Sequence, residues 1–206
     1  MTTQRKSLQE TLAGIIDART PQTGDFDMPV AGLSFFRREA PARPVICMIE
    51  PSIVLVAQGV KQVWVGGKAY GYDTTRFLIT SLDIPANSEV MVASPEQPCL
   101  GLVFKLDLRM VADLVAQSGM TPYRDRPIGI GAGIGTATPE LLAPFARLLA
   151  LLDEPDAIPV LAPLIQQEIH YRLLMRHQAS RLRHIASVDS QGYRIAKAID
   201  WLKLNY

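Results

Sequence analysis

Cysteine is scarce in this sequence, and the two that are present, Cys47 and Cys99, lie far apart with no CxxC spacing. Two isolated cysteines are typical of buried thiols in a reducing compartment and argue against a disulfide framework. No stretch reaches the roughly 18 consecutive apolar residues that a membrane helix needs, and the polar N-terminal segment has no signal-peptide pattern. We therefore expect a cytoplasmic protein that does not contact a membrane.

An excess of charge of either sign is also missing. Lys and Arg total 21 and Asp and Glu total 20, which leaves a formal net charge of +1. Segments that bind DNA usually have a clear basic excess, so we do not expect sequence-specific DNA binding by this segment. DNA contact is expected only through a C-terminal domain that is missing from this sequence.

Residues that carry chemistry are few. All three histidines, His170, His177 and His184, follow the strand-rich region, and none has a cysteine or carboxylate at metal-ligand spacing. A GxSxG nucleophile motif is absent, and the acidic residues of the strand region stand mostly beside turn signals. His170 and His177 are seven residues apart and are interpreted as interface or surface groups. We expect no metal, no cofactor and no enzymatic activity.

The apolar content, in contrast, is ample for a folded domain. Hydrophobic residues make up 48% of the 206 residues. A chain of this length can bury roughly 70% of the surface it exposes when unfolded, so it needs no disulfide or metal for stability. The length predicts one large domain or one domain with an appendage.

Hydrophobic periodicity divides the first half of the chain into a helix and a series of strands. Ser7 and Glu10 stand at capping-box spacing before a helical apolar stripe, which predicts a short amphipathic helix. From residue 31 to 106, short β-rich runs alternate with turn residues, which is typical of an antiparallel sandwich or barrel. The expected strands are Leu33–Arg38, Val45–Glu50, Ile53–Gln58, Gln62–Val65, Ala69–Tyr72, Phe77–Ser81, Glu89–Ala93 and Leu100–Leu106. The runs Ile53–Ala57 and Leu100–Phe104 are apolar throughout, so we expect both faces of these strands to be covered.

Beyond residue 106 the periodicity is mostly helical. Asp107 is a predicted N-cap for one helix and Thr138 for a second. A third helix is expected over Pro159–His177, antiparallel to the second because the linker is short. The alternating glycines at 129–135 meet no nucleotide-loop spacing and are interpreted as a strand or loop that closes the barrel. A last helix is expected from residue 189 or 190 onward.

A series of short segments gives the chain a family signature. In order, they are AGLSFFRR at 31–38, IEPS at 49–52 with VAQGVK at 56–61, YD at 72–73, SLDIP at 81–85, ASPE at 93–96, RLLALLDEP at 147–155, LAPLI at 161–165, EI at 168–169 and YRLL at 171–174. Together they resemble the N-terminal domain of a subgroup of AraC-type transcriptional regulators. Residues 195–202 resemble the first helix of that family's DNA-binding domain, so the resemblance covers nearly the whole chain.

The resemblance implies a mainly β fold with α: a cupin-like antiparallel β-barrel, related to the jelly roll, then a helical hairpin and one further helix. We place the N-terminal helix and barrel at 1–136, a dimerisation hairpin at 137–186, and a linker with the first helix of a helix-turn-helix domain at 187–206. The expected function is ligand sensing and homodimerisation in a DNA-binding transcriptional regulator. Two alternatives stay open. One is a cupin-like enzyme acting on a small molecule, which the lack of barrel histidines disfavours, and the other is a dimerisation module with a filled barrel.

An unknown small-molecule effector is expected inside the barrel. The candidate ligand-binding residues are Cys47, Ile49, Val54, Val56, Trp64, Tyr70, Tyr72 and Thr80. These positions offer little charge, which predicts a largely apolar or aromatic effector, and their orientation depends on a register that a one-residue slip would reverse. The candidate dimerisation residues are Leu161, Ile165, Ile169 and Leu173, which recur every four residues on the predicted third helix.

Overall fold

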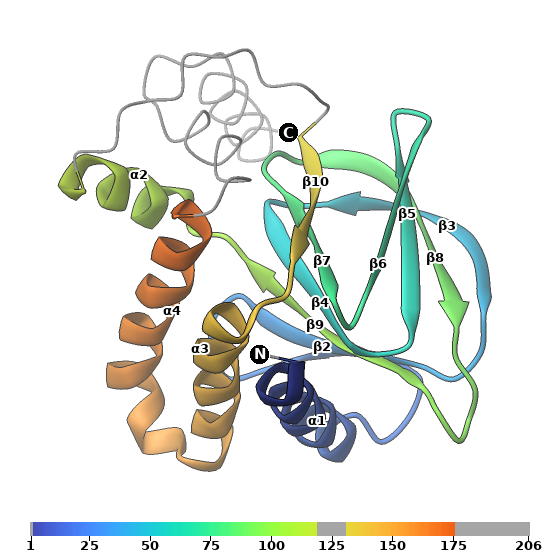
Figure 1. Cartoon of the computed structure of the whole chain (residues 1–206), viewed down its shortest axis with the longest axis horizontal. Helices are drawn as coiled ribbons and strands as arrows, with labels where there is room; N and C mark the ends of the chain where they lie inside the picture. Colours follow the sequence, from blue (N-terminus) through green and yellow to red (C-terminus); the bar gives the residue numbers. More distant parts are fainter. Residues whose placement is uncertain (1, 119–130, 176–206) are drawn as a thin grey trace.

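Figure 1 shows the chain in a computed structural model that describes residues 2–118 and 131–175. Within these residues one antiparallel sheet curves into a half-barrel, and helices lie beside it. The mainly β fold with a C-terminal helical hairpin, predicted from the sequence, is confirmed. The last predicted helix and His177 and His184 lie outside the described residues.

Every strand of the described residues belongs to this one sheet. The strands are β1 (Gly24–Asp27), β2 (Leu33–Arg38), β3 (Ala42–Ile49), β4 (Ser52–Gln58), β5 (Val60–Val65), β6 (Lys68–Asp73), β7 (Arg76–Thr80), β8 (Ile84–Val92), β9 (Cys99–Lys105) and β10 (Ala132–Thr136). Their spatial order is β1-β2-β9-β4-β7-β6-β5-β8-β3, and β10 pairs with β7. All eight predicted strands are present; β1 is additional, and the alternating glycines around residue 133 form β10, as one of the two interpretations predicted.

The sheet is apolar on both faces, because alternate residues of its central strands enter two different cores. Phe35, Ile53 and Leu55 pack toward the helices, together with Leu102 and Phe104 of β9. Their sequence neighbours on the opposite face, such as Phe36, Val54 and Val56, pack inside the half-barrel. The prediction that the strands around Ile53 and Leu102 are covered on both sides is therefore confirmed.

The helices form the second layer. They are α1 (Thr2–Arg19), α2 (Leu108–Gln117), α3 (Pro139–Ala150) and α4 (Ile158–Leu174), and two short 3-10 turns, Leu151–Asp153 and Pro155–Ala157, join α3 to α4. α1 and α3 lie side by side against the sheet, and α4 packs along α3 as an antiparallel hairpin (Figure 1). Leu12, Leu141 and Phe145 are fully buried in this layer.

Of the predicted helix caps, Asp107 is confirmed, Thr138 occupies the N-cap position of α3 without a side-chain capping hydrogen bond, and the Ser7–Glu10 box is wrong. The Asp107 carboxylate accepts hydrogen bonds from the backbone amides of Arg109 and Met110 at the start of α2. α3 begins at Pro139, as predicted. α1, however, begins at Thr2, so Ser7 lies inside the helix, where its carbonyl accepts from the Thr11 hydroxyl, and the capping-box prediction is wrong.

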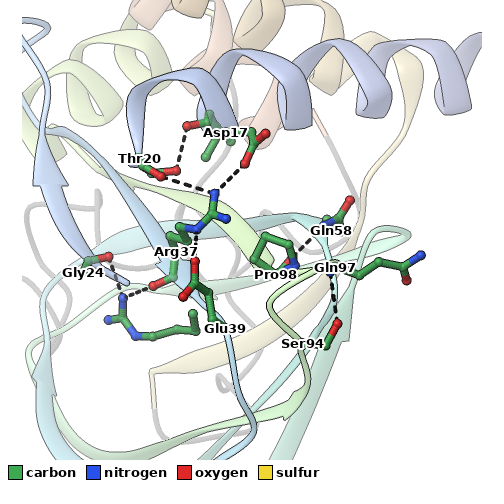
Figure 2. A network of polar contacts seen from close by, with 11 residues as sticks. Asp17, Thr20, Gly24, Arg37, Glu39, Gln58, Ser94, Gln97 and Pro98 are labelled. Carbon is green, nitrogen blue, oxygen red and sulfur yellow. Dashed lines mark hydrogen bonds and ion pairs between the residues drawn. The ribbon is translucent and has the colours of Figure 1, made fainter. Parts of the chain in front are cut away.

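A cluster of polar contacts fastens the end of α1 to the sheet (Figure 2). The Arg37 guanidinium donates to the Asp17 carboxylate, the Thr20 carbonyl and the Glu39 carboxylate. The Arg37 side chain is 14% exposed, so its charge is balanced by these partners within a mostly desolvated site. Arg37 thereby fixes the helix that covers the outer face of the half-barrel.

Candidate functional site

A cavity of about 730 Å³ lies on the inner face of the half-barrel. Residues from β1 to β9 line it, so the wall joins positions that are up to 80 residues apart in the sequence. Its apolar lining includes residues of five strands, namely Cys47 and Ile49 on β3, Val54 on β4, Leu78 on β7, Val90 on β8 and Val103 on β9. The volume falls within the range of about 300 to 1,000 Å³ that small-molecule sites usually occupy.

Charged side chains also line this cavity, which the sequence did not lead us to expect. Arg38 donates from Nη2 to both carboxylate oxygens of Asp25, at 2.7 and 2.8 Å. The Lys105 ammonium pairs with the Glu50 carboxylate at 2.5 Å. The cavity therefore carries more charge than the sequence led us to expect, in part because β1, which contributes Asp25, was not predicted as a strand.

Lys61 is the third cation of the lining, and among the described residues it forms no ion pair. Its ammonium nitrogen lies over the ring of Phe36, 4.2 Å from the ring centre. Burial lowers the pKa of the Lys61 amine, and the nearby Arg38 acts in the same direction. Asp25 and the two cysteines act in the opposite direction without cancelling the effect of burial.

Tyr72 stands directly opposite Lys61 across the β5–β6 pair. Its side chain is almost fully buried and lines the same cavity. Burial raises the pKa of the Tyr72 phenol well above its usual value, and a hydrogen bond with Ser88 acts weakly in the opposite direction. The hydroxyl is therefore protonated at physiological pH and is a hydrogen-bond donor.

The two cysteines are both free thiols, but only Cys47 lines the cavity. Cys99 is fully buried in the inner core, and burial raises its pKa. Cys47 is half-buried, and burial raises its pKa as well, although Lys61 opposes this shift. The expected reading as buried thiols fits Cys99 fully and Cys47 in part.

Of the eight candidate ligand-binding residues, the structure brings four together in the cavity lining, namely Cys47, Ile49, Val54 and Tyr72. Val56 and Tyr70 are on the inner side but are packed in the apolar core away from the cavity. The Thr80 hydroxyl donates to the Glu50 carbonyl and accepts from the Ser52 amide. Trp64 is 39% exposed, and its indole donates a hydrogen bond to the Glu89 carboxylate. Its side chain lies on the outer face of β5 because the residues next to it in the strand face inward, and successive residues of a strand alternate between faces.

The candidate dimerisation residues divide between two faces of α4. Ile169 and Leu173 are buried in the chain's own core, so they are not available to a partner. Ile165 is half-buried, and Leu161 is exposed. The exposed apolar residues of α4 are Val160, Leu161, Leu164 and Tyr171, and Met175 follows directly after the helix.

His170 was interpreted from the sequence as an interface or surface group, and the structure corrects this. The ring is 2% exposed and contacts Phe104. One ring nitrogen accepts a hydrogen bond from the backbone of α2's N-cap residue, so the side chain joins α4 to α2. Its role in the described structure is to hold two helices together.

Two further negative observations concern the described residues alone. No group of three His, Cys, Asp or Glu residues is placed there to hold a metal ion. No helix among them is both long and apolar enough to cross a membrane.

The fold and site define a class: a cupin-like antiparallel half-barrel with an inner cavity, followed by a helical hairpin. The sequence profile for the N-terminus of AraC-type transcriptional regulators matches residues 29–181, and the chain belongs to this family. The family consists of transcriptional regulators and is not a family of enzymes, which sets aside the alternative of a cupin-like enzyme.

One solved structure shows the same fold at low sequence identity. A single-residue variant of apo ToxT from Vibrio cholerae strain SCE256 superimposes with a TM-score of 0.58 and 7% identity, over 86% of this chain and 66% of that one. The AraC-like transcriptional activator CuxR gives a TM-score of 0.38 and 14% identity, over 85% of this chain and 58% of that one. The chain thus spans somewhat less than two thirds of either protein. A comparison with curated proteins found no match.

Proposed function

We propose that this chain is the effector-sensing and dimerisation part of an AraC-type transcriptional regulator. The observation that carries the proposal is the cavity of about 730 Å³ inside the half-barrel, which a ligandless module with a filled barrel would not need. The chain belongs to a family of transcriptional regulators, so binding of an effector in this cavity would control transcription. As part of this proposal, the protein works in the cytoplasm and contacts DNA through a separate domain.

The effector is a small molecule with an apolar body and at least one polar group. Val54, Leu78 and Val90 provide a surface for the apolar part. The polar part meets charged and hydroxyl groups, among them Lys61 and Tyr72. This effector is more polar than the largely apolar or aromatic one expected from the sequence.

The dimer contact is the outward face of α4. Val160, Leu164 and Tyr171 lie four and seven residues apart and therefore on one helical stripe, and Met175 extends this stripe by one turn. Leu164 is 59% exposed. A second copy of the chain is the proposed occupant, because an identical apolar stripe on an antiparallel partner helix would cover it symmetrically.

A small-molecule screen by thermal shift tests the sensing role. Compounds that stabilise the chain should lose their effect in Val103→Trp, because Val103 is a half-buried lining residue and an indole there fills part of the cavity. Val92→Trp is the matched control, since Val92 is exposed on β8 and is not part of the lining. Compounds that stabilise wild type and both variants equally would contradict the proposed site.

A further inference from the structure

Lys61 has no partner that explains its place in the cavity. The other two cations of the lining, Arg38 and Lys105, are each held by a carboxylate. Among the described residues Lys61 forms no ion pair; its ammonium lies over the Phe36 ring, and Asp25 and the two cysteines act on it only from a distance. A desolvated ammonium without a carboxylate is costly, so the site favours the neutral amine more than a lysine site normally does.

The charge balance of the lining argues against an anion as the partner of Lys61. Three cations line the cavity, and so do three carboxylates, those of Asp25, Glu50 and Asp83. The wall therefore carries no net positive charge that would attract an acidic ligand. The lowered pKa of the Lys61 amine also argues against an anionic partner, because it increases the fraction of the amine that is uncharged and nucleophilic.

Tyr72 adds a hydrogen-bond donor at the right position. Lys61 and Tyr72 are directly paired residues on neighbouring antiparallel strands, which places their Cβ atoms within roughly 5 Å on the same face of the sheet. Both side chains line the cavity. An amine and a protonated phenol that face the same cavity can act together on one ligand group.

We propose that Lys61 binds a carbonyl-containing effector, an aldehyde or ketone with an apolar body, as a reversible imine. The inference rests on the proposed function, since it concerns the same cavity. The Lys61 nitrogen adds to the carbonyl carbon, and its proton passes to the carbonyl oxygen to give a carbinolamine. Loss of water then forms the C=N bond, with no change in oxidation state. Tyr72 donates to the carbonyl oxygen and then to the departing hydroxyl, and the apolar wall around Val54 and Leu78 limits hydrolysis of the imine.

Reductive trapping with a defined aldehyde tests the inference. The purified chain is incubated with hexanal and sodium cyanoborohydride, which reduces an imine to a stable secondary amine, and the adduct is located by peptide mass mapping. Lys68 is the internal comparison, because it lies on the same hairpin with its nitrogen over the Tyr70 ring at 5.3 Å, but it is exposed and does not line the cavity. Because burial lowers the pKa of the Lys61 amine and raises its neutral fraction, Lys61 should be labelled faster than Lys68.

Variants separate the imine from ordinary lysine labelling. Lys61→Arg keeps the positive charge and should remove the fast adduct, and Lys68→Arg should leave it unchanged. Tyr72→Phe should slow labelling of Lys61 while circular dichroism shows an intact fold. Equal labelling of Lys61 and Lys68, or no labelling of Lys61, would overturn the inference.

The alcohol 1-hexanol shows whether a negative labelling result refutes only the imine or the effector cavity as well. It has the same apolar body as hexanal but cannot form an imine. If hexanal and 1-hexanol both stabilise wild type but not Val103→Trp, and Lys61 stays unlabelled, the imine is refuted while the effector cavity stands. If ligands stabilise wild type and Val103→Trp alike, the effector cavity itself is refuted.

Discussion

His170 on α4 accepts a hydrogen bond from the backbone amide of Asp107, the N-cap residue of α2, at 3.0 Å from Nε2. Its other nitrogen, Nδ1, lies 2.7 Å from the Gln166 carbonyl, to which it donates. This pattern requires the neutral imidazole, because a protonated Nε2 could not accept. The joint between α2 and α4 therefore depends on an uncharged histidine.

The first prediction is a loss of stability in mild acid. Burial lowers the pKa of His170 below its usual value of about 6.5, so the unfolded chain binds more protons between the native pKa and 6.5. The contribution of His170 is full above about pH 6.5 and is lost as pH falls through the native pKa. Urea unfolding at pH 7.5 and 5.5 should show a smaller drop in the free energy of unfolding for His170→Gln than for wild type. Equal drops would mean that His170 does not control this dependence.

The second prediction concerns the fastening of α1 by Arg37. Arg37→Ala removes three hydrogen-bonded contacts of a mostly buried guanidinium and leaves Asp17 and Glu39 without it, so the free energy of unfolding should fall by about 2 kcal/mol. Lys6→Ala is the control, because the ion pair of Lys6 with Glu10 is exposed and contributes less than about 0.5 kcal/mol. Chemical denaturation checks both values, and similar losses would contradict the role given to Arg37.

The third prediction separates the two faces of α4. Leu164→Glu should shift a dimer to monomer without unfolding it, because Leu164 is exposed on the proposed contact stripe. Leu173→Glu should instead prevent folding, since that side chain is buried in the chain's own core. Sedimentation velocity and circular dichroism distinguish these outcomes, and Val92→Glu serves as a surface control on β8. A Leu164→Glu protein with the sedimentation coefficient of wild type would place the contact elsewhere.

The fourth prediction tests the close contact between β9 and its neighbours. A Cβ on Gly101 would overlap the Leu55 carbonyl oxygen and the Phe36 ring. Gly101→Ala should therefore cost more than about 3 kcal/mol or abolish folding. Gly71→Ala on β6 is the matched control, because the nearest atom to its Cβ would be Gln62 Oε1 at 3.9 Å. Thermal unfolding of the two variants gives the comparison.

The fold could be predicted well from local patterns, and the site only in part. Strand β2 occupies Leu33–Arg38, the range that its short β-rich run predicted, because that signal is local. β1 is a four-residue strand with two aspartates, so it gave no such signal. The pairing of β1 with β2 brings Asp25 to Arg38. This contact joins two separate segments, so the pattern within either segment could not predict it.

Lys61 and Trp64 show why the site was missed. Lys61 stands one residue before the predicted start of its strand, Gln62, and was not among the candidate ligand-binding residues, whereas Trp64 was. In β5 the residues Lys61, Val63 and Val65 share one face and Trp64 lies on the other. An alternation count over the whole of β5 would have grouped Lys61 with the buried valines. On α4, the stripe with Val160 and Leu164 and the stripe with Ile169 and Leu173 have similar apolar patterns in the sequence. Only the packing of α4 in the helical layer shows that Ile169 and Leu173 face inward.

Methyl NMR of the chain with labelled valine and leucine methyl groups tests the central claim, that the inner cavity is the effector site. On titration with a stabilising compound from the screen, we predict saturable shifts for the Val54, Leu78 and Val90 methyls, which line the cavity. The same shifts should be absent in Val103→Trp. Shifts confined to Val160 and Leu164 on the exposed face of α4, with the cavity methyls unchanged, would contradict the account.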